Sequence, residues 1–138
     1  CGEYEKRLSR FCNIEIFEVA DLKNPDLSSD ALCRGVIKKE GEEILKKLGD
    51  GFTVAMCVEG VQKTSEEFAA LIDEAAMKSG KINFIIGGSL GLSEEVKKRA
   101  DLKLSMSEMT FPHGLARVVL LEQIYRGYKI IANESYHK

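Results

Sequence analysis

The chain has no tryptophan, only two prolines and only four cysteines among its 138 residues. Its 12 glycines follow no period, which excludes collagen-like and low-complexity material. Apolar residues make up 44% and charged residues 30%, so the composition is that of a globular domain and not of a disordered chain. This length suits one domain, and we expect residues 1–138 to form it.

Long hydrophobic runs are also missing. Runs such as Val118–Leu121 fall far short of the roughly 20 residues of a membrane-spanning helix. The opening residues do not have the pattern of a signal peptide. The formal net charge of −2 excludes nucleic-acid binding through bulk positive charge, although a local basic face remains possible. We expect a cytoplasmic protein that does not associate with membranes.

The four cysteines, Cys1, Cys12, Cys33 and Cys57, are widely spaced and contain no C-x-x-C pair. Such spacing argues against a zinc site and against a disulfide framework. Two of the cysteines lie in apolar stretches, so we expect reduced, buried thiols and no bound metal.

Hydrophobic periodicity predicts alternating strands and helices. Residues 13–19 (NIEIFEV) alternate polar and apolar side chains, as a strand does. Residues 52–58 (FTVAMCV) form a continuous apolar run, typical of a strand covered on both faces. Further strands are expected at 82–86 and 102–106, and helices at 2–8, 30–48, 65–79, 93–99 and 114–131. This order predicts an α/β fold with a mostly parallel sheet flanked by helices.

Local signals fix some of these boundaries. Thr64 is followed three residues later by Glu67, which is a capping box at a helix start. Gly80 ends that helix. A loop is expected at 21–29, where Ser28 or Ser29 caps the following helix.

Two segments lie where strands end and helices begin, which is where open sheets bind ligands. One is the glycine turn Gly87–Gly91, whose backbone a ligand could approach closely, or which is only a tight connection. The other, Met56–Gly60, occupies the same kind of position.

Residues 104–114 (LSMSEMTFPHG) are too polar for a strand and too irregular for a helix. Such a loop can offer backbone hydrogen bonds and an apolar wall to a flat heterocycle. A plain connecting loop is the alternative.

The helix that follows is apolar around its whole circumference, whereas a surface helix needs one apolar stripe. One face can pack on the sheet, so we expect the other to meet a second copy of the chain. Arg117 lies in its first turn, unfavourably placed for the helix dipole, which suggests an anionic ligand; an ordinary surface arginine is the alternative.

Both histidines, His113 and His137, lie in the last 26 residues together with Tyr125, Tyr128 and Tyr136. Basic residues outnumber acidic ones there, which fits contact with a nucleic acid. A frayed terminus is the alternative.

Taken together, these segments resemble one family, the RlmH-type methyltransferases of the SPOUT superfamily. The resemblance covers the whole chain, and its combination of motifs is specific although no single motif is. The matching motifs are EYEKRL (3–8), KEG (39–41), SEEFA (65–69), IGGSLGL (86–92), MTFPH (109–113), RVVL (117–120), EQIYR (122–126) and YHK (136–138).

The resemblance implies an α/β knot fold of SPOUT type, in which the C-terminal part forms a trefoil knot. It implies a homodimer joined through the C-terminal helix, in which the partner chain helps to complete each site. It implies methylation of N3 of a pseudouridine in helix 69 of 23S rRNA, within the assembled 70S ribosome, with S-adenosyl-L-methionine as cofactor.

Carried over to this sequence, the resemblance assigns residues to the cofactor and to the reaction. The cofactor-binding residues would be Met56, Gly87, Met106, Ser107, Glu108, Met109, Thr110 and Phe111. His137 is the first candidate for the base and His113 the second. Arg117 would stabilise a uracil carbonyl or bind phosphate, and Tyr136 would stack on the base.

The sequence departs from the family in two places. Met56 stands where members usually have leucine, a mild change of shape. Members also begin with a strand, a Gly-Lys turn and most of a helix before the Glu-Tyr motif, so we expect this sheet to lack its first strand. Two other functions stay open: a SPOUT-like ribosome-binding protein without catalysis, and a flavodoxin-type nucleotide-binding module, which has no phosphate loop to support it.

Overall fold

The computed structural model describes residues 2–18, 30–87 and 91–136. Strands and helices alternate along most of this part of the chain, which confirms the predicted α/β class. The elements are α1 (Gly2–Leu8), α2 (Asp30–Lys47), β1 (Phe52–Gln62), α3 (Ser65–Ser79), β2 (Ile82–Ile86), α4 (Glu94–Arg99), β3 (Leu102–Ser105) and α5 (His113–Ile131).

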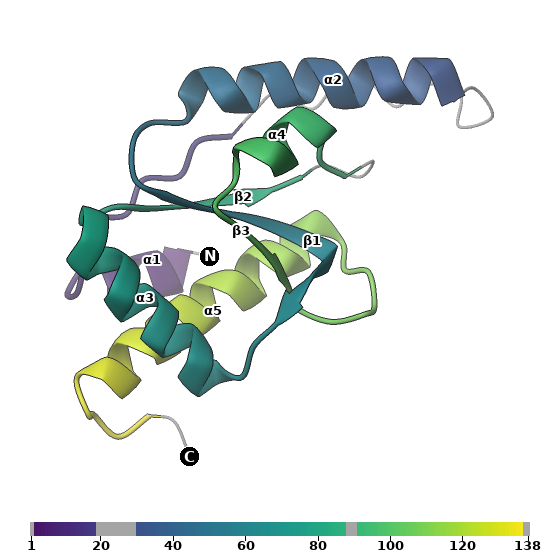
Figure 1. The fold of residues 1–138 in the computed structure, drawn as a ribbon. Helices are drawn as coiled ribbons and strands as arrows, with labels where there is room; N and C mark the ends of the chain where they lie inside the picture. Colours follow the sequence, from purple (N-terminus) through teal and green to yellow (C-terminus); the bar gives the residue numbers. More distant parts are fainter. Residues whose placement is uncertain (1, 19–29, 88–90, 137–138) are drawn as a thin grey trace.

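The sheet has the strand order β2-β1-β3, and both neighbouring pairs are parallel. Figure 1 shows α2 and α4 on one face of the sheet and α1, α3 and α5 on the other. The parallel sheet between helical layers is therefore as predicted. The C-terminal trefoil knot stays a prediction, because part of the glycine turn, residues 88–90, lies outside the described residues.

Alternate side chains of β1 build a core on each face of the sheet, as the period of two along a strand requires. Val54 is fully buried in the lower cluster, on the face covered by α1, α3 and α5. Its neighbour Ala55 is fully buried in the upper cluster, on the face covered by α2 and α4. The upper cluster joins Ala55 to Val96 of α4, with Leu45 of α2 packed against it. This two-sided burial explains the uninterrupted apolar run in the sequence of β1.

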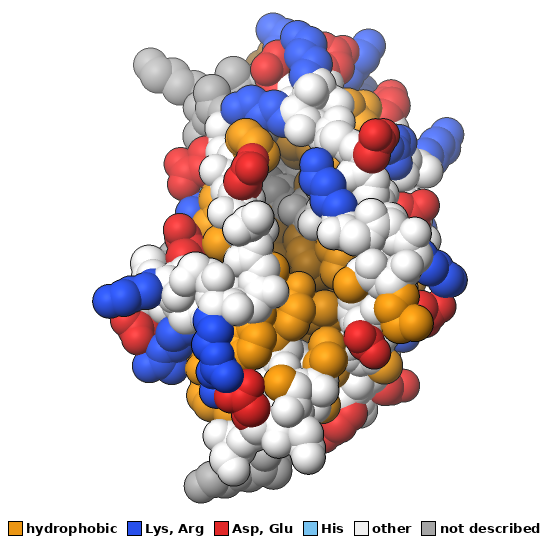
Figure 2. Space-filling view, turned by 90° about the vertical axis from the view of Figure 1, so that its left-hand side faces the viewer, with side chains coloured by type: hydrophobic (Ala, Val, Ile, Leu, Met, Phe, Trp, Pro, Cys, Tyr) orange, Lys and Arg blue, Asp and Glu red, His pale blue; other side chains and the backbone are white. Residues whose placement is uncertain are grey.

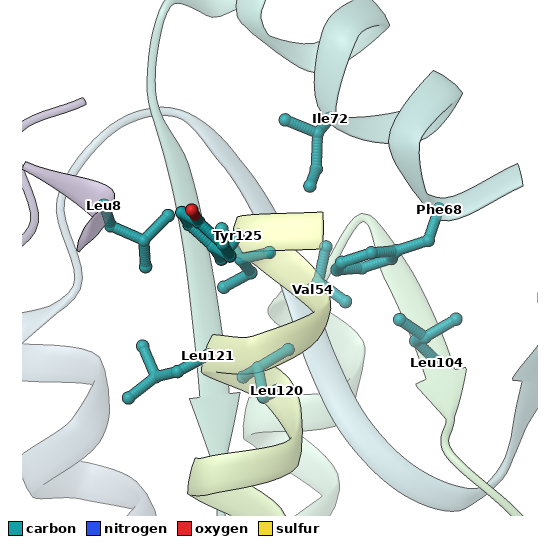
Figure 3. Packing of buried hydrophobic residues seen from close by; sticks show 9 residues of the cluster. Leu8, Val54, Phe68, Ile72, Leu104, Leu120, Leu121 and Tyr125 are labelled. Atoms are coloured by element: carbon teal, nitrogen blue, oxygen red, sulfur yellow. The ribbon is translucent and has the colours of Figure 1, made fainter. Parts of the chain in front are cut away.

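The lower and larger core lies between the sheet and α1, α3 and α5 (Figure 3). Ile72 of α3 and Leu8 of α1 are fully buried in it, with Leu121 of α5 close to fully buried. Aromatic rings add to the contact between α1 and α5. Phe11, three residues after the end of α1, stacks on Tyr128 of α5 with ring centroids 5.5 Å apart. Through these contacts the short α1 is anchored on the long α5.

Strand β1 is longer than the predicted 52–58 because it pairs with β3 in two stretches. Met56 lies opposite Leu104, and after an interruption Val61 lies opposite the same residue. Residues 57–60 bulge out of the pairing between β1 and β3, and we call this segment the arch. Within it, Gly60 passes so close to β3 that an added Cβ would lie 2.6 Å from the backbone nitrogen of Leu104. Only glycine permits this approach.

The predicted strand at residues 13–19 is wrong over its described part, residues 13–18, which contains no strand. An alternating pattern favours an extended backbone, but a strand also needs a hydrogen-bonded neighbour, and the sheet here consists of β1, β2 and β3. Phe17 is accordingly 63% exposed instead of facing a core. The predicted loop at 21–29 and its capping serines lie outside the described residues.

The described helices include none with the length and apolar composition needed to cross a bilayer. Cys12, Cys33 and Cys57 are free thiols, and Cys1 lies outside the described residues. Burial raises the pKa of the Cys57 thiol, so little of it is thiolate at neutral pH.

We expect Ile72→Ala to destabilise the domain, because the side chain is fully buried where α3 meets α5. Losing three carbons there should cost about 2–5 kcal/mol in the free energy of unfolding. Urea denaturation measures this as a lower midpoint at constant slope.

The matched control is Met77→Ala on the same helix, where the side chain is 81% exposed. It should change stability by less than about 0.5 kcal/mol. Equal losses for the two variants would show that the packing beneath the sheet is not what stabilises the fold.

Candidate functional site

The ends of β2 and β3 lie on either side of Met56. Met56 itself lies within β1, which continues to Gln62, so the prediction that Met56–Gly60 follows the end of a strand is wrong. In the sheet, Met56 lies opposite Ile86 on one side and Leu104 on the other. Gly87 follows Ile86 directly, and Met106 comes two residues after Leu104. Pairing of parallel strands thus brings together the start of each predicted cofactor segment, at the sheet edge where ligands bind in open α/β folds.

A hollow of about 230 Å³ opens beside these strand ends, between β1, β3, α3 and α5. Its apolar wall includes Met56, Leu104 and Met106, and its polar groups come from Lys63, Ser65, Ser105 and Gln123. Phe68, Val119 and Leu120 complete the lining. Ligand pockets usually measure about 300–1,000 Å³, so a nucleoside-sized ligand would fill this hollow and extend along the adjoining loops.

The loop after β3 is folded by two serines. The Ser105 hydroxyl donates to the carbonyl of Ser107 at 2.8 Å, and the Ser107 hydroxyl accepts from the amide of Met109 at 3.0 Å. Met106 therefore faces the hollow while Met109 is 72% exposed. Among the predicted cofactor residues of this loop, Met106 lines the hollow, Ser107 and Phe111 are partly buried, and Glu108, Met109 and Thr110 are exposed.

The glycine turn is sterically tight at Gly87. An added Cβ there would lie 2.9 Å from the carbonyl carbon of Gly91 and 3.0 Å from the Leu92 side chain. Beyond the turn, the Ser93 hydroxyl caps α4 by accepting from the amide of Val96 at 3.3 Å. Gly88, Ser89 and Leu90 lie outside the described residues.

An ion pair connects the arch of β1 to α4, on the face of the sheet opposite α3 and α5. Glu59 in the arch pairs with Lys97 of α4. This hydrogen bond lowers the pKa of Glu59 and raises that of Lys97. The arch is therefore tied to α4 as well as to β3.

Arg117 lies in the first part of α5, where it faces carboxylates from the N-terminal segment. Its Nη1 donates to Glu18 at 2.7 Å, and its Nη2 lies 4.0 Å from Glu5 of α1. The hydrogen bond from Arg117 lowers the pKa of Glu18. The Arg117 Nε is buried and has no hydrogen-bond partner among the described residues. An anionic ligand would have to compete with Glu18 for this guanidinium.

His113 is the first residue of α5 and is exposed. Tyr136, in contrast, packs beside the other end of that helix, with its ring edge-on to Tyr125 at 5.0 Å between centroids. Burial raises the pKa of the Tyr136 hydroxyl, and a hydrogen bond with Tyr4 adds to the shift. His137 lies outside the described residues.

The catalytic candidates do not all converge within one chain. Arg117 and Tyr125 are eight residues apart on α5, which corresponds to about 12 Å along a helix axis. Since Tyr136 packs on Tyr125, the structure separates Tyr136 from Arg117 and His113. A second chain is one way to bring the two groups together.

Sequence reasoning did not assign Ser65 and Gln123, which lie on the polar side of the hollow. The Ser65 hydroxyl donates to Gln123 Oε1 at 2.7 Å and so joins the start of α3 to the middle of α5. The sequence signal that could have identified Gln123 is its polar amide within the otherwise apolar last helix, whose other side chains indicate packing.

The basic tail is more balanced in the structure than its sequence indicates. Arg10 of the N-terminal segment and Lys129 of α5 both pair with Glu134, at 2.9 and 3.0 Å. The face drawn in Figure 2 likewise carries lysine, arginine, aspartate and glutamate side chains interspersed around an apolar hollow. Neither observation indicates a strongly basic surface.

No group of three or more His, Cys, Asp or Glu side chains among the described residues is arranged to hold a metal ion.

Comparison with known proteins gives consistent matches over almost the whole chain. Residues 1–137 match a family model described as "Predicted SPOUT methyltransferase". A ribosomal RNA large subunit methyltransferase H of Bifidobacterium animalis subsp. lactis is 54% identical over 138 residues, which are 99% of this chain and 87% of that protein. Proteins of the same name from Exiguobacterium sibiricum and Clostridium beijerinckii are each 52% identical, with the same two shares covered.

Proposed function

Because the chain belongs to the SPOUT methyltransferase family and is a methyltransferase, we propose that its substrate is ribosomal RNA and its methyl donor S-adenosylmethionine. The target is N3 of a pseudouridine in helix 69 of 23S rRNA, within the assembled 70S ribosome. The family match agrees with the resemblance drawn from the sequence motifs. The choice of nucleotide and its position in the rRNA come from that resemblance alone. The observation that carries the proposal is that the ends of β2 and β3 flank Met56 of β1 beside a hollow.

We assign the residues around Met56 to S-adenosylmethionine, a nucleoside whose amino-acid tail carries a sulfonium sulfur. Met56, Gly87 and the loop Met106–Phe111 would hold S-adenosylmethionine, with apolar side chains against its flat ring. The missing side chain of Gly87 lets the turn close against Gly91 and Leu92, which would fix the shape of the backbone at this end of the site. When bound, this cofactor supplies a methyl group already activated by sulfonium charge. The protein then has to align the nucleophile and handle one proton.

The proton is the N3–H of the pseudouridine, which lies between two carbonyls and is only weakly acidic. His137 is our candidate for the base, because a neutral imidazole is available near pH 7. Arg117 would stabilise the negative charge that develops on a carbonyl, or bind a phosphate, once Glu18 is displaced. Tyr136 would stack on the base. His113 is the second candidate for the base and would otherwise order the loop before α5.

A homodimer through α5 would bring the separated groups together, because an antiparallel partner helix places its C-terminal end beside the first turn of this one. Leu115 and Ile131 at the two ends of α5 are 50% and 40% exposed, although Leu120, Leu121 and Ile124 are buried within the chain. The exposed apolar side chains are available to a second copy.

The assembled ribosome is a better substrate than naked RNA for a protein of net charge −2. Bulk attraction to phosphate would be weak, so shape and contacts with the ribosome would have to supply affinity. A ribosomal substrate places the enzyme in the cytoplasm, and cell fractionation would check this location.

We expect Gly87→Ala to weaken binding of S-adenosylmethionine by about tenfold or more, because the new Cβ forces the turn against the Gly91 backbone. Isothermal titration calorimetry measures the dissociation constant on a chain whose folding is checked by its melting temperature.

Gly35→Ala is the matched control, because an added Cβ in α2 has no atom within 4 Å. It should leave the dissociation constant unchanged. If a folded wild-type chain does not bind the cofactor, the proposed function is wrong.

For His137→Ala we predict a fall in the methylation rate of about 100-fold or more, since a general base contributes that much. Its affinity for S-adenosylmethionine should stay within about twofold, because the base acts on the acceptor. The assay follows transfer of labelled methyl groups to purified ribosomes that lack the modification, with mass spectrometry to locate the product.

A comparable loss of cofactor affinity in His137→Ala would make the histidine a binding residue instead. Methylation at a different nucleotide would refute the pseudouridine assignment while leaving the methyltransferase itself in place. Naked 23S rRNA serves as the second substrate and should react far more slowly than ribosomes.

The dimer is tested by sedimentation equilibrium, where the wild type should have twice the 15.4 kDa chain mass. We expect Leu115→Asp to shift the equilibrium toward monomer, because it places a charge in an apolar interface. Met77→Asp on α3, where the side chain is 81% exposed, should leave the dimer intact. A monomeric wild type would exclude the shared site.

A further inference from the structure

Glu122 of α5 is a largely buried carboxylate to which neither the cofactor nor the proton step gives a role. Its side chain is 18% exposed. One oxygen, Oε1, accepts from Arg126 Nε at 2.8 Å and lies 2.6 Å from Arg126 Nη2. The other oxygen, Oε2, accepts from Gln123 Nε2 at 2.9 Å. A carboxylate with this many donors is held in one orientation.

The same carboxylate reaches the C-terminal tail. The Tyr136 hydroxyl donates to Glu122 Oε1 at 3.4 Å. The Arg126 guanidinium, which Glu122 holds, lies 4.9 Å from the centre of the Tyr136 ring. Tyr125 closes another side of that ring, edge-on at 5.0 Å. Tyr136 is thus held by an aromatic edge, by its hydrogen bond with Tyr4, and by a cation and a carboxylate, and the last two contacts involve Glu122.

We propose that Glu122 is a positioning residue that fixes Tyr136, and with it the start of the C-terminal tail, against α5. It acts through Arg126, whose planar guanidinium it orients beneath the tyrosine ring. The inference rests on the proposed function in one respect only, namely that Tyr136 contacts the base to be methylated.

The charge on Glu122 matters to this arrangement. Two nitrogens of the guanidinium meet one carboxylate oxygen, and this contact fixes the plane of the cation. A tilted or displaced guanidinium would lose much of its attraction to the ring, which depends on geometry. Glu122→Gln keeps nearly the same shape but replaces the carboxylate with a neutral amide, which cannot orient the cation as strongly.

A second branch connects Glu122 to the hollow. Gln123 donates to Glu122 and accepts from Ser65, so its amide is fixed at both ends. Gln123 and Ser65 both line the hollow beside Met56. Glu122 therefore also contacts the wall of the candidate cofactor site, but Ser65 holds Gln123 from the other end, so this wall does not depend on Glu122 alone.

The first arm of the test measures the position of Tyr136 directly. The chain has four tyrosines, so a protein labelled with ¹³C-tyrosine gives few ring signals, and Tyr136→Phe assigns the one of interest. In the wild type we expect that signal to be displaced from the free-tyrosine shift by Tyr125 and Arg126. In Glu122→Gln it should move toward the free value.

Glu74→Gln is the matched control, since Glu74 makes an exposed ion pair with Lys78 within α3 at 2.9 Å. It should leave the Tyr136 signal where it is. Should Glu122→Gln fail to fold, Arg126→Lys tests the same contact, because lysine keeps the charge but not the planar fork.

The second arm is kinetic and uses the ribosome methylation assay. Glu122→Gln should lower kcat about tenfold and leave the KM for S-adenosylmethionine within about twofold. In a Tyr136→Ala background, adding Glu122→Gln should lower kcat by less than about twofold, because its route of action is already gone. A merely structural loss would lower kcat by the same factor in both backgrounds.

An unmoved Tyr136 signal in Glu122→Gln overturns the proposal, and so does an equal kinetic loss with and without Tyr136. If the wild-type chain does not methylate ribosomes, the proposed function fails, but the signal of Tyr136 still decides whether Glu122 holds it. A moved signal with unchanged kcat would show that Glu122 fixes the tail and that the tail does not govern the reaction, which overturns the positioning role.

Discussion

The register of the central strand is the constraint on which the rest of the molecule depends. Met56 of β1 pairs with Ile86 on one side and Leu104 on the other, so this register places the ends of β2 and β3 beside each other across β1. A slip by one residue in either pair would turn Val54 and Ala55 to the wrong faces and empty both cores. The same pairing that keeps the two cores apart therefore gathers the glycine turn and the loop after β3 at one place.

Local chemistry was readable from the sequence because its partners lie a few residues apart. Thr64 and Glu67 form the predicted capping box, with hydrogen bonds of 2.9 and 3.1 Å between side chain and backbone. The helix starts and the apolar strands β1 and β2 followed from similar short-range signals. The cofactor segments came from the family resemblance and stay a prediction.

What could not be predicted depends on contacts between distant residues. The arch of β1 arises because Met56 and Val61 lie against the same residue of β3, and no pattern within β1 records that. The failed strand at 13–19 shows the converse, since a suitable pattern forms no strand without a neighbour. Gln123 looked like a polar interruption until Ser65 and Glu122 were placed on either side of it.

The anchoring of α1 on α5 also governs the order in which the chain can fold. Arg10 and Glu134 pair across 124 positions of sequence, and the stack of Phe11 on Tyr128 spans nearly as many. Closing so long a loop costs chain entropy before any contact repays it. During synthesis α1 therefore lacks its contacts with α5 until residues 125–134 have left the ribosome. The core between the sheet and α1, α3 and α5 is completed only after that.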